Sequence, residues 1–193
     1  VYFRKRLFEL VEGRAFYSYE DVLIDDISIN APSFIKKDED ANGEIGQLIS
    51  KVGLTLSRDT RDSILFPKEG SIMSLKKEFA GGIFGGDAEY GRLELQGARF
   101  IQTFDPMEQV LSVSGRTGTI GRFNGEEADV PFFERFFLGG PYNLRGWDYR
   151  DVGVDPSEGE PEGGNSYSYA SLEYTFKVAD PLRLALFYDA GYL

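Results

Sequence analysis

The stretch LISKVGLTLSRD, residues 48–59, alternates apolar and polar side chains along its length. Successive side chains of a β-strand point to opposite faces of the sheet, so this alternation predicts a strand with one apolar and one polar face. The apolar face would carry Leu48, Val52, Leu54 and Leu56, and the polar face Lys51, Gly53, Thr55, Ser57 and Asp59.

The same alternation recurs along the whole chain, mostly in segments of about 9 to 15 residues, the length of tilted membrane strands. No stretch approaches the roughly 20 consecutive apolar residues of a membrane-spanning helix, which excludes a helical membrane protein. The sequence therefore predicts an all-β chain of eight antiparallel strands, at about residues 2–8, 14–29, 48–59, 73–79, 87–101, 109–120, 166–176 and 182–193.

The connections between these segments differ in length. Those near residues 10–13, 60–70, 102–108 and 178–181 are mostly short, whereas those at 30–45 and 121–165 are long. Short turns on one side and long loops on the other are typical of outer-membrane barrels. A water-soluble antiparallel sandwich or barrel stays open as an alternative, because one apolar and one polar face suit either solvent.

Composition excludes several classes of function. The chain has no Cys and no His, which excludes a disulfide framework and most zinc sites and nucleophilic triads. No other nucleophile with a partner base can be assembled. The formal net charge of −11 disfavours a nucleic-acid partner. We therefore expect a protein that is not an enzyme and has no metal or cofactor.

Five tyrosines lie in the predicted strands. Tyrosine is enriched where a barrel meets the membrane–water interface, so we expect an interfacial girdle, with ordinary cross-strand pairing as the alternative. The five are Tyr17, Tyr19, Tyr167, Tyr169 and Tyr174.

The long connection contains PFFERFFLGGPYNLRGWDYRDVG, residues 131–153. This stretch resembles the signature of the BamA-type assembly and secretion barrels, the bacterial surface-antigen family. The resemblance consists of an aromatic approach, a glycine pair and a hydrophobic-Arg-Gly-aromatic motif, which are here Phe136 and Phe137, Gly139 and Gly140, and Leu144, Arg145, Gly146 and Trp147.

Two further stretches carry the resemblance over nearly the whole chain. TRDSILFPKEG, residues 60–70, is similar to the family's periplasmic turn through Arg61, Asp62, Pro67 and Gly70. FYDAG, residues 187–191, is similar to its Phe-x-Asp-x-Gly strand. The resemblance implies a transmembrane barrel of sixteen strands, of which this chain holds about eight, with POTRA domains and the remaining strands outside residues 1–193.

In this family the long external loop folds into the barrel lumen, where the motif arginine meets acidic groups on the inner wall. The resemblance assigns that role to Arg145, with Glu173 and Asp189 as its partners. Both acids fall on the polar faces of their predicted strands, and a guanidinium can bridge two carboxylates. Gly146 would let the backbone turn where a Cβ could clash, and Trp147 would add apolar contact.

The function implied is that of an insertase, which assembles unfolded client β-barrel proteins into the bacterial outer membrane without nucleotide hydrolysis. Its partners would be outer-membrane lipids, the clients and accessory subunits of an assembly complex. A related translocation or two-partner secretion pore is the first alternative. A passive porin or a soluble β-sandwich is the alternative from another class.

Overall fold

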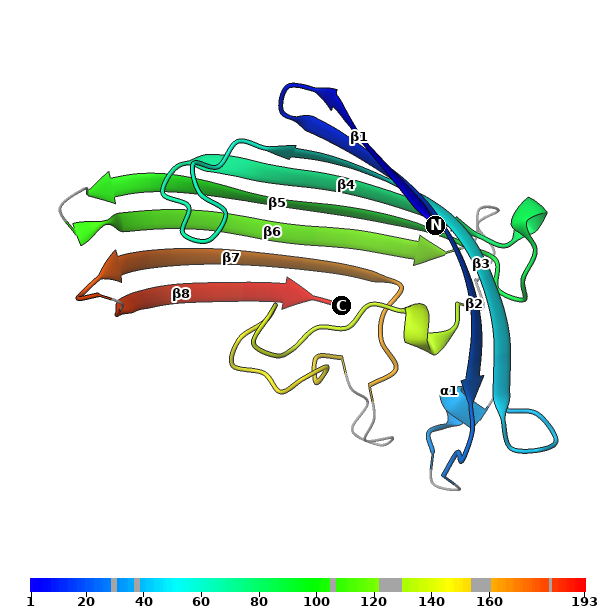
Figure 1. Ribbon diagram of the computed structural model, residues 1–193. Coiled ribbons are helices and arrows are strands. Elements are labelled where there is room, and N and C mark those ends of the chain that lie inside the picture. The colour runs from blue at the N-terminus through cyan, green and yellow to red at the C-terminus, as the bar shows by residue number, and fades with distance from the viewer. Residues whose placement is uncertain (29–30, 37–38, 105–106, 122–129, 154–160, 181) are drawn as a thin grey trace.

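The computed structural model describes residues 1–28, 31–36, 39–104, 107–121, 130–153, 161–180 and 182–193. Its strands form one antiparallel sheet in which each strand pairs with its neighbours in chain order (Figure 1). No helix in these ranges combines the length and the apolar character needed to cross a membrane. The strands are β1 (Tyr2–Phe8), β2 (Val11–Ile24), β3 (Ile45–Asp59), β4 (Gly70–Ala80), β5 (Tyr90–Phe104), β6 (Gln109–Gly121), β7 (Ser166–Lys177) and β8 (Arg183–Tyr192).

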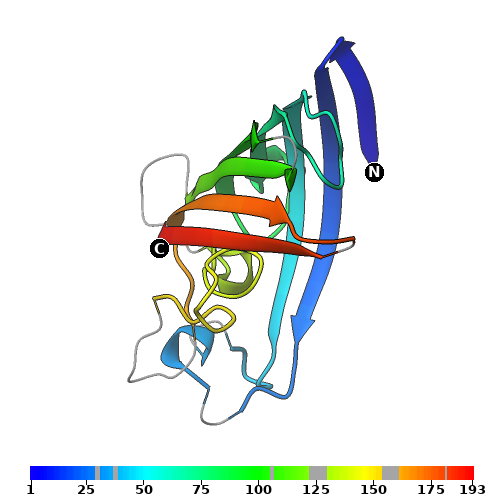
Figure 2. The ribbon, with the colours of Figure 1, turned by 90° about the vertical axis from the view of Figure 1, so that its left-hand side faces the viewer.

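The predicted all-β antiparallel fold is confirmed, and the sheet is strongly curved (Figures 1 and 2). Paired residues of neighbouring strands share a face. Lys76 pairs with Glu94, and Glu78 with Arg92, so the concave face is charged. The convex face carries exposed apolar side chains on almost every strand, among them Leu54, Leu56, Met73, Leu75, Leu93, Leu95, Val113, Leu172, Leu184, Leu186 and Tyr188.

The strand connections lie at two ends of the sheet. At one end are the segments 9–10, 60–69, 105–108 and 178–182; at the other are 25–44, 81–89 and 122–165. Among the described residues, three short helices stand at the second end, namely α1 (Ser33–Lys36), η1 (Gly82–Phe84) and η3 (Phe132–Glu134). All the longest connections therefore meet at one end of the strands, while parts of them, residues 29–30, 37–38, 122–129 and 154–160, lie outside the described residues.

The hydrophobic core lies between the sheet and the segment 130–153. Tyr90 and Ile49 are fully buried there, and Val130 and Phe136 reach them from the segment. Figure 2 shows that the segment lies on the concave side of the sheet. A stretch that was predicted only as a connection between two strands thus supplies part of the packed core.

Several predicted strand boundaries differ from the structure by three to five residues, among them those of the second and fifth strands. The second strand ends at Ile24, five residues before the predicted boundary, which itself lies outside the described residues. The fifth begins at Tyr90 rather than at Asp87. Asp87 instead exchanges hydrogen bonds with Leu48: its N–H donates to the Leu48 carbonyl, and its carboxylate accepts the Leu48 N–H. Residue 87 therefore extends the pairing of β3 and does not begin β5.

The tyrosine girdle is wrong for two of its five members. Tyr167 lies on the concave face, with its ring centroid 4.5 Å from that of Phe136. Tyr169 has the same parity in β7 and shares that face. Tyr17, Tyr19 and Tyr174 lie on the convex face, and their interfacial position stays a prediction.

Candidate functional site

Arg145 extends from the segment 130–153 to the concave face of β7 and β8. Its Nε and Nη2 donate to the two carboxylate oxygens of Asp189 at 2.7 and 2.8 Å. Its Nη1 donates to Glu173 Oε2 at 2.5 Å, and its Nη2 also donates to Ser171 Oγ at 3.0 Å. The backbone N–H of Arg145 adds a bond of 3.1 Å to Asp189. The structure thus brings together the three residues that the resemblance had paired.

Strand register explains why these acceptors converge. Ser171 lies directly opposite Asp189 in the β7–β8 ladder, and Glu173 lies two residues further along β7, on the same face. Glu173 is itself paired with Phe187, whose ring centroid lies 3.6 Å from Arg145 Cζ. The guanidinium therefore meets two carboxylates, a hydroxyl and an aromatic face on two adjacent strands.

Burial makes the loss of one partner of this contact more costly than in a surface ion pair. The Asp189 side chain is 2% exposed, compared with 25% for Arg145 and 28% for Glu173. A buried carboxylate without a cation would be costly, so Asp189 depends on Arg145. Hydrogen bonding to Asp189 raises the pKa of the Arg145 guanidinium above its usual value, so the group stays cationic wherever the protein is folded.

Glycines give the segment its path to the wall. Gly139 has φ +111°, and a Cβ there would lie 2.3 Å from the Asp148 carbonyl oxygen. Gly146 has φ +93° but open space around it. The expected backbone turn at Gly146 is confirmed by its left-handed φ, whereas the expected clash of a Cβ with neighbouring atoms is wrong.

Leu144 and Trp147 flank the arginine and differ in burial. Leu144 is 5% exposed, and its Cδ1 would lie 3.4 Å from a Cβ at Gly191 of β8. The Trp147 side chain is 54% exposed, while its backbone carbonyl accepts the Gly140 N–H at 3.1 Å. Leu144, rather than Trp147, therefore supplies the buried apolar contact of the motif.

Two residues of the segment were not found from the sequence. Asn143 Oδ1 accepts the N–H groups of Gly139 and Leu144, at 3.0 and 2.6 Å, and so closes the turn that presents Arg145. Glu134 contacts Lys51 and Arg92 on the opposite part of the sheet. The sequence offered one signal for the Glu134 contact. Lys51 and Arg92 both fall on the polar faces of their predicted strands, where an acidic side chain could meet them.

The second predicted motif forms the connection between β3 and β4, at the other end of the sheet. Arg61 binds the Asp59 carboxylate through Nε and Nη2 at 2.9 and 2.7 Å. Asp62 Oδ1 accepts hydrogen bonds from the N–H groups of Lys68 and Glu69. Pro67 precedes these two residues in the chain and Gly70 follows them. Gly70 has φ +98°, and a Cβ there would lie 2.2 Å from the Thr60 carbonyl oxygen. These residues stabilise a turn far from Arg145.

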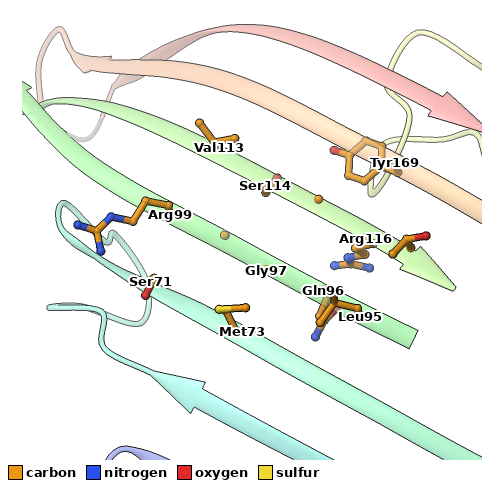
Figure 3. Close-up of a pocket in the computed structure, with 13 residues that line it drawn as sticks. Ser71, Met73, Leu95, Gln96, Gly97, Arg99, Val113, Ser114, Arg116 and Tyr169 are labelled. Carbon is orange, nitrogen blue, oxygen red and sulfur yellow. The ribbon is translucent and has the colours of Figure 1, made fainter. Parts of the chain in front are cut away.

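A hollow of about 650 Å³ lies on the sheet (Figure 3), and Ser71, the residue after Gly70 of the turn motif, is part of its lining. Its lining comes from the strands β4 to β7, and Gly97 lies between Met73 and Val113 where the wall lacks a side chain. No residue of the segment 130–153 lines it. Within the described part of the chain, no group of three His, Cys, Asp or Glu residues could hold a metal ion.

Comparison with known proteins gives a consistent result. A family model described as the Omp85 superfamily domain matches residues 8–193. The outer membrane protein assembly factor BamA of Nitratidesulfovibrio vulgaris is 34% identical over 170 residues, which cover 86% of this chain and 20% of that protein. BamA of Neisseria meningitidis serogroup B is 31% identical over 173 residues, 82% of this chain and 21% of that protein.

Similarity extends to a eukaryote and to a solved structure. A SAM50-like protein of Schizosaccharomyces pombe is 32% identical over 151 residues, 75% of this chain and 31% of that protein. The crystal structure of Haemophilus ducreyi BamA lacking POTRA domains 1–3 superposes with a TM-score of 0.78 at 18% identity, over 98% of this chain and 40% of that one. At that identity the superposition establishes the fold. The chain spans a fifth to a third of the length of these three curated relatives.

Proposed function

Because the chain belongs to the Omp85 superfamily and is an outer-membrane protein of bacteria, we propose that the protein assembles client β-barrel proteins into that membrane. The relatives support this proposal by name: two are outer membrane protein assembly factors, and others are components of a sorting and assembly machinery. The clients would be unfolded β-barrel proteins, and the immediate partners would be outer-membrane lipids and accessory subunits of an assembly complex.

The proposed mechanism uses no nucleotide and no catalytic residue. An open strand edge presents unpaired N–H and C=O groups, and the hydrocarbon core of a bilayer makes such groups costly. A client strand that pairs with the edge removes this cost, so its insertion is templated by hydrogen bonding. The complete barrel would have sixteen strands and periplasmic POTRA domains, with its seam outside the eight strands of this chain.

The long connection 121–165 is proposed to be the external loop of that barrel, folded back into the lumen. Arg145 would fix it there by binding Glu173 and Asp189. The observation that carries this role is the set of four side-chain hydrogen bonds that Arg145 donates to β7 and β8. A fixed loop would maintain the curvature of the wall and occlude the pore.

The experiment uses the full-length protein in vesicles with an unfolded outer-membrane barrel as the client. Insertion is followed by the heat-dependent gel mobility of the client, without any nucleotide. We expect insertion with the wild type and a loss of about tenfold or more with Arg145→Ala. Arg150→Ala is the matched control, because Arg150 lies over the Phe137 ring, 4.2 Å away within the same segment.

Two outcomes would contradict the proposal. Insertion that is unchanged in Arg145→Ala would remove the role of the arginine. Export of one soluble substrate, with no effect of depletion on other membrane barrels, would instead identify a secretion pore.

A further inference from the structure

The segment 130–153 contacts the sheet at a second place, far from Arg145. Glu134, the last residue of η3, accepts a hydrogen bond from Lys51 Nζ of β3 at 2.9 Å. Its other carboxylate oxygen lies 3.6 Å from Arg92 Nη1 of β5. One acid of the segment therefore bridges two strands that are separated by β4.

Arg92 binds the segment in three ways. Its Nη1 donates to the Glu134 carbonyl oxygen at 3.1 Å, in addition to the ion pair with the Glu134 carboxylate. Its Cζ lies 4.4 Å from the centroid of the Phe136 ring. The Arg92 guanidinium thus contacts the main chain, a carboxylate and an aromatic face of one short stretch. A chance surface contact does not combine these three interactions.

This contact is shielded from water. The side chains of Lys51 and Glu134 are 13% and 11% exposed, and that of Arg92 is 18% exposed. The hydrophobic core cluster surrounds them through Ile49, Tyr90 and Phe136. Charges removed from water in this way are stable only as long as their partners stay in place. Loss of Glu134 would remove the nearest acceptor of Lys51, which keeps Glu20 at 3.4 Å, and would leave Arg92 with Glu94 and Glu78 on the sheet.

We propose that Glu134 is a second and independent anchor, which holds the segment to β3 and β5 while Arg145 holds it to β7 and β8. The segment then acts as a brace across the concave face and ties together strands that are not neighbours in the sheet. This role does not depend on whether the protein assembles or exports its clients. Glu134 is a positioning residue, since it acts through the segment it holds.

The two anchors have opposite polarity. At Arg145 a cation of the segment meets acids of the wall, and at Glu134 an acid of the segment meets cations of the wall. If the segment were seated the wrong way round, Arg145 would face Lys51 and Arg92, and Glu134 would face Glu173 and Asp189. Like charges would then oppose each other at both ends, although Glu20, Glu78 and Glu94 of the sheet also lie beside Lys51 and Arg92. The pattern therefore favours one orientation.

The test is hydrogen exchange on the full-length protein in a bilayer, resolved for peptides that cover residues 130–138 and 142–149. We expect Glu134→Gln to speed exchange in the first peptide by about tenfold or more and to leave the second within about twofold. Glu162→Gln is the matched control, because Glu162 pairs with Arg135 inside the same connection and is 55% exposed. It should change neither peptide.

Charge exchange separates a positioning role from a general loss of packing. Glu134→Lys should speed exchange at 130–138 more than Glu134→Gln does, because it adds a third cation beside Lys51 and Arg92. The double variant Glu134→Lys with Lys51→Glu should restore most of the protection. Unchanged exchange in Glu134→Gln, loosening of both peptides together, or failure of the exchanged pair to restore protection would overturn the proposal.

Discussion

Ser171 and Asp189 lie directly opposite each other in the β7–β8 ladder, and the Ser171 hydroxyl donates to Asp189 Oδ1 at 2.6 Å. The acid is therefore held in position by its own wall as well as by the cation that reaches it. Arg145 then binds acceptors whose positions are already fixed by the pairing of β7 with β8. The contact depends on strand register, which sets which side chains meet on the concave face.

Replacing Arg145 by Lys should not preserve the anchor. The guanidinium uses Nε, Nη1 and Nη2 together, whereas an ammonium can hold only part of that set. We expect Arg145→Lys to lower the stability of the folded barrel by about 2 kcal/mol. The temperature at which the protein loses its compact gel mobility measures this, and a value equal to that of the wild type would refute it.

Asp189 and Ser171 should differ in their importance to the same site. Asp189→Asn leaves Arg145 without its bidentate partner in a place where the acid is 2% exposed, which should cost about 3 kcal/mol. Ser171→Ala removes one neutral donor and should cost about 1 kcal/mol. Denaturant unfolding of both variants tests the order, and equal losses would contradict it.

Gly118 should tolerate no side chain, although its φ is not in the left-handed region. A Cβ there would lie 2.8 Å from the Tyr167 ring and 2.9 Å from the Phe136 ring. Gly118→Ala should therefore displace Phe136 and destabilise the packed segment by about 1–3 kcal/mol. Gly121→Ala is the control, because nothing lies within 4 Å of its Cβ position. Equal stability of the two variants would argue against this packing.

The turn between β3 and β4 should depend on pH through Asp62. Hydrogen bonds from the N–H groups of Glu69 and Lys68 hold the pKa of the Asp62 carboxyl below its usual value. Its stabilisation is thus complete above the ordinary aspartate pKa of about 3.9 and is lost as the pH falls through the lowered value. The amide resonances of Lys68 and Glu69 should shift in that range, and Asp62→Asn should abolish the shift. A shift that persists in the variant would assign it to another group.

Alternation alone was enough to predict the eight strands and the faces of their side chains. It placed Glu173 and Asp189 correctly because successive side chains of a strand point to opposite faces, so an identified strand fixes the face of each of its residues. It was less reliable at strand ends: Asp87 looks like a strand residue, but its pairing with Leu48 removes it from β5. Such an exchange between distant segments leaves no local trace in the sequence.

The tyrosines and Glu134 show a different limit. Tyr167 and Tyr169 were assigned to the interface by residue type, yet parity with Ser171 places them on the concave face, where Tyr167 packs on Phe136. Glu134 lies in an aromatic stretch whose side chains follow no regular period. Its role becomes visible only through its ion pairs with Lys51 and Arg92 in the folded protein. A side chain in an irregular segment is positioned by tertiary contacts, which periodicity does not report.

A double-mutant cycle between Arg145 and Asp189 measures whether this ion pair holds the segment to the sheet. The unfolding free energies of Arg145→Ala, Asp189→Ala and the double variant are measured in the full-length protein in detergent. We expect a coupling of about 1–3 kcal/mol, with the double variant losing less than the sum of the two single losses. Additive losses, with a coupling near zero, would mean that the arginine of the segment does not bind the wall.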